Sequence, residues 1–178
     1  MLSAPNAPTV SLEEFLANPH DRTEWVSGHL IQKQAMTAKT GRIQARLAFY
    51  WRSHMLSSGQ GGEVYTETSC RTIGRTRCPD VAYLTPDLVA QYGDFKVLPR
   101  SFSLVAAVIS PNDEAEEVFT KVREYLASEC EEVWLVFPDS QWVLVITSQR
   151  QELRGLEDIA TTHHVLSGFS VAVKELIA

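Results

Sequence analysis

The feature that most constrains the fold is an unbroken apolar run, Leu104-Val105-Ala106-Ala107-Val108-Ile109. Successive residues of a strand point to opposite faces of its sheet, so a run without polar positions predicts a strand buried on both faces. Such a strand requires other elements packed above and below it. We therefore expect a sheet with helices on its faces.

Patterns on either side of this run supply those elements. Apolar residues at helical spacing predict a helix from about Thr40 to Ser57, and an Asn112 or Asp113 cap predicts another through Leu126. Capping-box spacing and apolar periodicity predict short helices after Ser11 and over Val171–Ile177. Predicted strands are Glu24–Val26 and His29–Ile31 around a Ser27-Gly28 turn, Glu63–Cys70, Pro79–Leu84, Val133–Phe137 and Trp142–Ile146. The predicted fold class is α/β with a mixed sheet flanked by helices (an α+β arrangement), as one domain over 11–178 after a flexible N-terminus over 1–10.

Composition places the chain in a broad class. Its 178 residues, 44% of them hydrophobic, suffice for one domain with a core. No apolar run approaches the roughly 20 residues that span a bilayer, and the N-terminus lacks the pattern of a secretory signal. Cys70, Cys78 and Cys130 form no C-x-x-C pair, so we expect reduced thiols. We expect a cytoplasmic protein without membrane contact.

Charge is unevenly distributed along the chain. The formal charge is −6, yet Trp25 to Asp80 holds eight basic and three acidic residues, and no acid lies between Trp25 and Gly62. A basic surface on an acidic protein can still bind phosphate, because salt confines the opposing field to about 10 Å. The candidates for nucleic-acid contact are Lys39, Arg42, Arg46, Arg75 and Arg77. A solvated helix face remains an equally good interpretation of this pattern.

Five segments occur in an order and spacing that resemble a known family: Glu24-Trp25-Val26-Ser27-Gly28, Arg77-Cys78-Pro79-Asp80-Val81-Ala82, Leu104 to Pro111, Lys121-Val122-Arg123-Glu124-Tyr125-Leu126 and Val133-Trp134-Leu135-Val136. The resemblance is to the Uma-type restriction endonucleases, a branch of the PD-(D/E)xK nuclease superfamily formerly classed as a domain of unknown function. It runs from about Ser11 to Leu176 and implies a restriction-endonuclease-like fold.

The resemblance also implies Mg²⁺-dependent hydrolysis of phosphodiester bonds in DNA. In such a site carboxylates hold the ion, which polarises the scissile phosphate and activates a water, while a lysine stabilises the developing charge. Asp80 matches the first metal-binding carboxylate, Lys121 the catalytic lysine and Glu24 a further acid. Because cutting both strands needs two sites, the resemblance further predicts a homodimer.

One position departs from the family pattern. The second carboxylate belongs on the central strand, where Ala107 stands, and Ala107 offers no ligand. Ile109, where other branches of the superfamily carry their lysine, offers none either. Glu24, Glu67 or Asp113 could supply a replacement oxygen. With Asp80 alone, Mg²⁺ should bind weakly.

Simpler interpretations of these residues stay open. Asp80 could be a turn acid, Lys121 could be solvated, and Glu24 could pair with Arg22 or Arg77. His163 and His164 are adjacent in a polar stretch, so their side chains should point apart and serve no metal.

Three functional hypotheses follow from the resemblance and its departure. The first is an endonuclease with a degenerate active site. The second is a catalytically inactive nuclease-fold module that binds nucleic acid or a protein partner, and a purely structural subunit is a weaker third. If the nuclease assignment holds, Asp80 and Ala107 should lie on neighbouring strands and face one cleft near Lys121.

Overall fold

The computed structural model describes residues 9–178, so most of the expected flexible N-terminus lies outside the described residues. From Val10 onward the chain is attached to the first hairpin. The Val10 N–H donates to the carbonyl of Gly28 at 2.9 Å, and the Trp25 indole donates to the carbonyl of Val10 at 2.8 Å.

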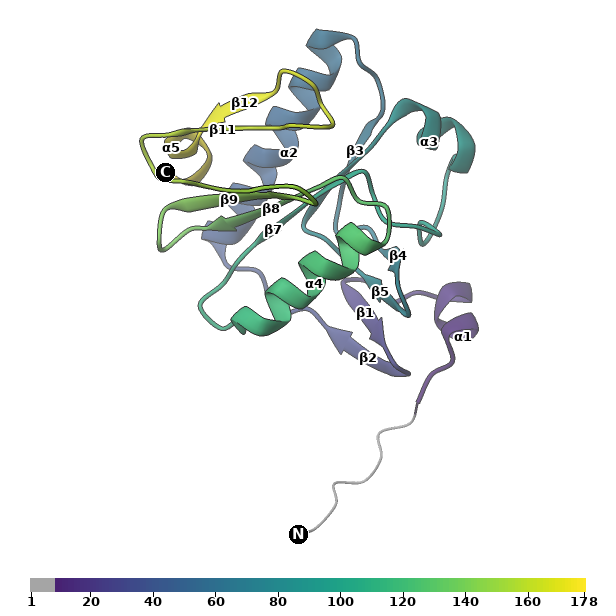
Figure 1. Ribbon diagram of the computed structural model, residues 1–178. Coiled ribbons are helices and arrows are strands. Elements are labelled where there is room, and N and C mark those ends of the chain that lie inside the picture. Colours follow the sequence, from purple (N-terminus) through teal and green to yellow (C-terminus); the bar gives the residue numbers. More distant parts are fainter. Residues whose placement is uncertain (1–8) are drawn as a thin grey trace.

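A six-stranded sheet forms the centre of the molecule (Figure 1). Its strands are β3 (Glu63–Thr66), β6 (Val81–Leu84), β7 (Leu104–Val108), β8 (Glu132–Phe137), β9 (Trp142–Thr147) and β10 (Gln151–Arg154). Their order is β10-β9-β8-β7-β6-β3, with β7 and β8 parallel and every other neighbouring pair antiparallel. The apolar run is the inner strand β7, and the predicted mixed sheet is confirmed.

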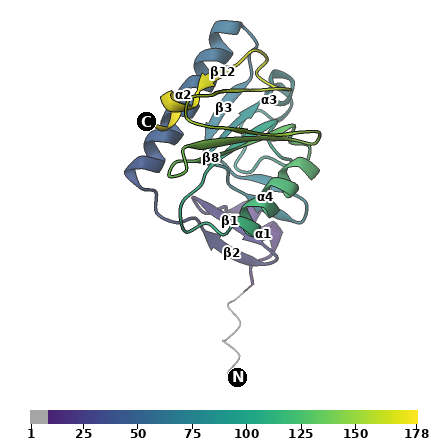
Figure 2. The same cartoon turned by 60° about the vertical axis from the view of Figure 1, so that its left-hand side comes forward.

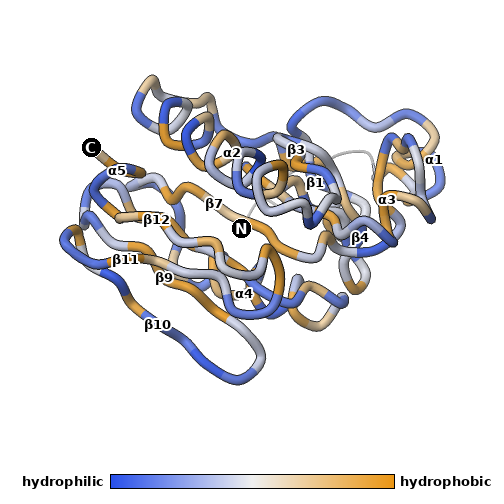
Figure 3. The backbone as a smooth tube through the Cα atoms, turned by 90° about the horizontal axis from the view of Figure 1, so that it is seen from above, coloured by the Kyte–Doolittle hydropathy of each residue, from blue (hydrophilic) through white to orange (hydrophobic). Residues whose placement is uncertain are grey.

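Two long helices lie on opposite sides of this sheet, α2 (Ala38–Ser58) on one side and α4 (Ala115–Ala127) on the other (Figures 1 and 2). Parallel strands need a long crossover, and α4 provides the one between β7 and β8. Alternate residues of β7 serve the two sides: Leu104 and Ala106 join the core under α2, whereas Val105 joins the core under α4. In Figure 3, β7 is coloured mainly hydrophobic and the edge strand β10 mainly hydrophilic.

The core under α2 is closed by the C-terminal part of the chain. Strands β11 (Ile159–Thr161) and β12 (Ser170–Ala172) pair, and α5 (Val173–Ile177) follows them against α2. Trp51 of α2 meets Trp134 of β8 edge-to-face with ring centroids 6.0 Å apart, and both side chains are fully buried. This is a geometry that aromatic pairs prefer.

A second, four-stranded sheet lies beside the first and carries the hairpin around Ser27-Gly28. Its strands are β1 (Thr23–Val26), β2 (His29–Gln32), β4 (Cys70–Thr72) and β5 (Arg75–Arg77), in the order β2-β1-β5-β4. Ser27 (φ 51°) and Gly28 (φ 88°) both have positive φ, as the two central residues of a type I′ hairpin turn require. The chain passes from this sheet to the six-stranded one through Cys78, Pro79 and Asp80.

Several predicted boundaries differ from the structure. The single strand expected over Glu63–Cys70 is β3 followed by β4, because the chain turns at Glu67 (φ 50°). Helix α4 has Glu114 as its N-cap instead of Asn112 or Asp113, since the Asp113 carboxylate accepts from the N–H of Ser110 at 2.7 Å.

Two short helices complete the described part of the chain. The helix predicted after Ser11 is α1 (Leu12–Ala17), with the Ser11 hydroxyl accepting from the N–H of Glu14, whereas α3 (Pro86–Tyr92) was not predicted. The three cysteines are buried and unpaired. Over residues 9–178, no helix combines the length and the apolar character needed to cross a bilayer.

Candidate functional site

A cleft of about 360 Å³ opens between the four-stranded sheet, α4 and the adjoining ends of β6 and β7. Asp80, Ala107, Lys121 and Glu24 all line it, as does Lys33, which follows β2 directly. The structure thus brings together the candidate catalytic residues and Ala107, the position at which the resemblance predicts a second carboxylate. Their catalytic and metal-binding roles remain predictions.

Asp80 and Ala107 lie on neighbouring strands. Val81 pairs with Ala106 in antiparallel register, which places the preceding residue, Asp80, opposite Ala107. The Asp80 N–H donates to the carbonyl of Ala106 at 3.1 Å, and its carboxylate Oδ2 accepts from the N–H of Val108 at 2.6 Å. The backbone of β7 therefore fixes the Asp80 carboxylate, and β7 presents no second acid beside it.

The other oxygen of Asp80 is bound by Lys33. The Lys33 ammonium donates to Asp80 Oδ1 at 2.6 Å, to Glu67 Oε2 at 2.7 Å and to the carbonyl oxygen of Cys78 at 3.0 Å. Arg22 Nε lies 3.4 Å from the same Glu67 oxygen. We call Lys33, Asp80, Glu67 and Arg22 the Lys33 cluster. Burial alone would lower the pKa of Lys33, but Asp80 foremost among the nearby negative groups raises it above its ordinary value, so the side chain is a cation.

Glu24 and Lys121 belong to a separate cluster. Glu24 of β1 is 3% exposed, and its two carboxylate oxygens lie 3.1 and 2.9 Å from the Lys121 ammonium of α4. Glu24 Oε2 also accepts from Arg77 at 2.7 Å. Burial would raise the pKa of Glu24, but Lys121 and Arg77 together lower it below its ordinary value. Among the described residues, Lys121 pairs with Glu24 and not with Asp80.

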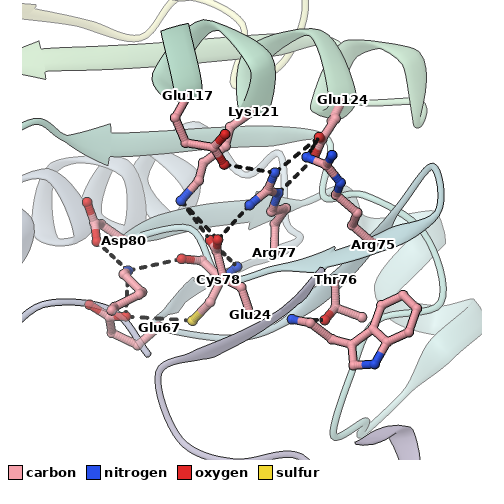
Figure 4. Close-up of polar contacts among 12 residues, drawn as sticks. Glu24, Glu67, Arg75, Thr76, Arg77, Cys78, Asp80, Glu117, Lys121 and Glu124 are labelled. Carbon is pink, nitrogen blue, oxygen red and sulfur yellow. Dashed lines mark hydrogen bonds and ion pairs between the residues drawn. The ribbon is translucent and has the colours of Figure 1, made fainter. Parts of the chain in front are cut away.

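Arg77 is the centre of this second network, shown in Figure 4. Its side chain is fully buried, and its guanidinium contacts Glu24 of β1 together with Glu124 (2.7 Å) and Glu117 (3.2 Å) of α4. Arg75 donates to Glu124 as well, at 2.5 Å. We call Arg77, Glu24, Lys121, Glu117, Glu124 and Arg75 the Arg77 cluster. Because it joins both β1 and β5 to α4, it holds together the two walls of the cleft.

Cys78 connects the two clusters through its backbone. Its carbonyl accepts from Lys33, and its N–H donates to Glu24 Oε1 at 3.4 Å. Its thiol lies 3.6 Å from Glu67 Oε2, and burial raises the pKa of this thiol to about 12. A thiol that stays protonated is a poor nucleophile, so Cys78 serves the site through its main chain.

The oxygens of the site do not fit a magnesium ion as they are arranged. Within residues 9–178, no group of three or more His, Cys, Asp or Glu side chains is placed to hold a metal ion. Mg²⁺ demands six oxygens at about 2.0–2.1 Å. Of the alternative acids, Asp113 is occupied by Ser110, and Glu24 by Arg77 and Lys121. Glu67 does approach Asp80, but both carboxylates bind the Lys33 ammonium.

The five predicted nucleic-acid contacts are not gathered on one open surface. Lys39 pairs with Asp139 at 2.6 Å, and Arg46 donates to the carbonyl oxygens of Leu176 and Ala178. Arg75 and Arg77 lie in the Arg77 cluster, and the full burial of Arg77 leaves its guanidinium no access to a phosphate. Arg42 is exposed, with no partner among the described residues.

The histidine pair lies away from the cleft. The N–H groups of His163 and His164 donate to the carboxylate of the buried Glu132, at 2.8 and 3.3 Å. The Trp134 indole donates to the other oxygen of Glu132 at 2.7 Å. The pair is thus held by its backbone in a structural contact.

Lys33 is the site residue that sequence reasoning missed. It was counted only as one of eight basic residues, and it follows a strand whose side chains are all exposed. No local pattern marks such a lysine as buried. The simpler interpretation of Glu24 as a partner of Arg77, in contrast, is confirmed.

Comparisons with known proteins agree with this fold. A family model described as Uma2, putative restriction endonuclease, matches residues 11–174. A crystal structure of a putative nuclease belonging to DUF820 from Anabaena variabilis ATCC 29413 superposes with a TM-score of 0.83 at 20% sequence identity, covering 94% of this chain and 97% of that one. No curated protein matches the sequence.

Proposed function

Because the chain belongs to the Uma2 family of restriction-endonuclease-like proteins, we propose that it is a nuclease-fold protein whose catalytic centre no longer hydrolyses phosphodiester bonds. The observation that carries this proposal is the surroundings of Asp80. Ala107 stands opposite it where a second acid is required, and the Lys33 ammonium binds its remaining oxygen at 2.6 Å. DNA is the ligand class to which the family points.

The charge of the cleft supports the loss of hydrolysis. Five acids line it against three basic residues, Arg22, Lys33 and Lys121. Without an added cation, such a surface disfavours the approach of a phosphodiester. The two basic residues nearest to the candidate centre, Lys33 and Lys121, are both paired with carboxylates. The site thus lacks a free positive charge for a developing phosphorane.

Plasmid cleavage with Mg²⁺ or Mn²⁺ tests the proposal. The unaltered protein and Asp80→Ala should convert supercoiled plasmid equally slowly, at the background rate. Ala107→Glu supplies the missing carboxylate, and Ala107→Gln is its uncharged control of the same size. A second acid beside Asp80 would favour a divalent ion over the Lys33 ammonium, so we expect cutting to rise only in the Glu variant. Asp80→Ala in that variant should remove the gain. Ala107→Glu should also lower the stability of the fold, because it places a new carboxylate at a half-buried strand position.

A second candidate function rests on Glu67. Its Oε2 shares the Lys33 ammonium with Asp80, while its buried Oε1 has no hydrogen-bond partner. If Lys33 moved aside, Glu67 and Asp80 would form a carboxylate pair, and the protein would be an active nuclease. In that case the unaltered protein cuts plasmid, and both Asp80→Ala and Glu67→Gln abolish the cutting. The homodimer expected from the family stays a prediction.

A further inference from the structure

We infer that Lys33 is a built-in cation, whose ammonium takes the place between Asp80, Glu67 and the Cys78 carbonyl that a divalent metal ion could otherwise occupy. The inference deepens the proposed function and rests on it, because it identifies what the altered centre holds instead of a metal. It also predicts that the lysine, and not only the absence of a carboxylate at Ala107, keeps metal out.

The first argument is the geometry of the oxygens. Three oxygens from two segments of the chain, Glu67 and Cys78-Pro79-Asp80, converge on one point, and the Lys33 nitrogen lies 2.6, 2.7 and 3.0 Å from them. These are hydrogen-bond distances to an ammonium, and they are longer than the Mg²⁺–oxygen distance of about 2.0–2.1 Å. A lysine has three N–H donors and no acceptor, so the three oxygens use its full capacity.

The second argument is burial. The side chains of Lys33, Glu67 and Asp80 are 18%, 17% and 12% exposed. Two carboxylates brought together with so little contact to water repel each other unless a cation lies between them. Lys33 provides that cation. Arg22, 3.4 Å from Glu67, balances the second negative charge.

The third argument is competition. A divalent ion would have to displace a tethered ammonium, which would lose both of its carboxylate partners in a mostly buried place. Removing one partner from a buried ion pair is costly, and this cost opposes the entry of the metal. The covalent tether also holds the ammonium at the site regardless of the metal concentration in solution.

Removing the charge of Lys33 should therefore create a metal site. Lys33→Met keeps an unbranched stem of similar length but no ammonium. It leaves two carboxylates and one carbonyl oxygen facing the same space, with waters to complete the coordination. Carboxylates, carbonyls and waters are the ligands that hard divalent ions prefer.

The test is Mn²⁺ titration of ¹⁵N-labelled full-length protein, followed by paramagnetic broadening of backbone amide signals. The reporter is the amide of Val108, which donates to Asp80 Oδ2. We expect no selective broadening at Val108 in the unaltered protein. We expect it in Lys33→Met and Lys33→Gln, with an apparent affinity at least about tenfold higher. Lys39→Met, which removes an exposed lysine paired with Asp139, is the matched control and should behave as the unaltered protein.

Two results of the Mn²⁺ titration would overturn the inference. Selective broadening of Val108 in the unaltered protein would overturn it, because the lysine would not then exclude the metal. The inference is also overturned if neither neutral variant binds Mn²⁺ more tightly than the unaltered protein. This holds even for a variant that is unfolded without metal, because Mn²⁺ should replace the missing cation and restore its folding. Mn²⁺ binding is read independently of plasmid cleavage, so failure of this inference is distinguishable from failure of the proposed function.

Discussion

Replacing Arg77 with methionine should be among the most destabilising single changes in this protein. The Arg77 side chain is fully buried and contacts three glutamates, at 2.7 Å for Glu24 and Glu124 and 3.2 Å for Glu117. Methionine fills most of the same space without a charge. Glu24, itself 3% exposed, would keep only Lys121 and the N–H of Cys78 as partners.

The expected loss follows from these contacts. Removing one partner of a buried ion pair costs about 3–5 kcal/mol, because the remaining charge is left without compensation. Lys121 still compensates Glu24, and Arg75 still compensates Glu124, so the loss should fall near the lower limit. A loss of about 3 kcal/mol is a large part of the 5–15 kcal/mol by which a typical domain is stable.

Urea unfolding at neutral pH, analysed by linear extrapolation, measures this change. The control is Lys39→Met, which removes an exposed ion pair with Asp139 and should cost about 0–1 kcal/mol. Arg77→Met combined with Glu24→Gln should cost less than the sum of the single changes, because the double variant leaves no uncompensated charge on Glu24.

Two results would refute this reasoning. If Arg77→Met cost less than about 1 kcal/mol, the guanidinium would not be the charge that holds the cluster together. If the costs of the two substitutions simply added, Arg77 and Glu24 would not depend on each other in the folded protein.

Acidification should destabilise the protein through Glu24, whose pKa lies below its ordinary value of 4.5 in the fold. The contribution of Glu24 to stability is present above its unfolded pKa and is lost as pH falls through its lower folded pKa. Between about pH 7 and pH 3, Glu24→Gln should therefore lose less unfolding free energy than the unaltered protein. Equal losses would assign the acid sensitivity to other groups. If α2 contacts DNA, changing Lys39, Arg42 and Arg46 to alanine should flatten the salt dependence of binding, measured by fluorescence anisotropy. Each neutralised phosphate contributes about 0.9 to the slope of log K against log salt, and an unchanged slope would remove this helix from the interface.

The Arg77 cluster gives two of the candidate catalytic residues, Glu24 and Lys121, a structural role. Glu24 and Lys121 form a pair that links β1 to α4 across the cleft, so their removal would alter the cleft even if neither took part in chemistry. Stability and metal binding therefore have to be measured beside activity in any variant of these residues.

The amino-acid sequence by itself determined the elements that depend on short-range patterns. The unbroken run from Leu104 predicted an inner strand, Ser27-Gly28 predicted a hairpin turn, and helical spacing predicted α2 and α4. These features follow from side-chain periodicity and backbone preference within a few residues. The five segments that resemble the Uma-type family were also sufficient for the family assignment.

Only the tertiary structure decided which charges meet. Lys33 and Asp80 are 47 residues apart in the chain, and Arg77 and Glu24 are 53 apart, yet both pairs are in direct contact. The three-residue strand β5 was not predicted, because its pairing with the distant β1 stabilises it, and β4 in turn pairs with β5. A charged side chain carries the same local signal whether it is solvated or buried, since its partner is brought by the fold of remote segments. For this reason the sequence could propose Asp80 and Ala107 as site positions, whereas only the tertiary structure showed that Lys33 contacts Asp80.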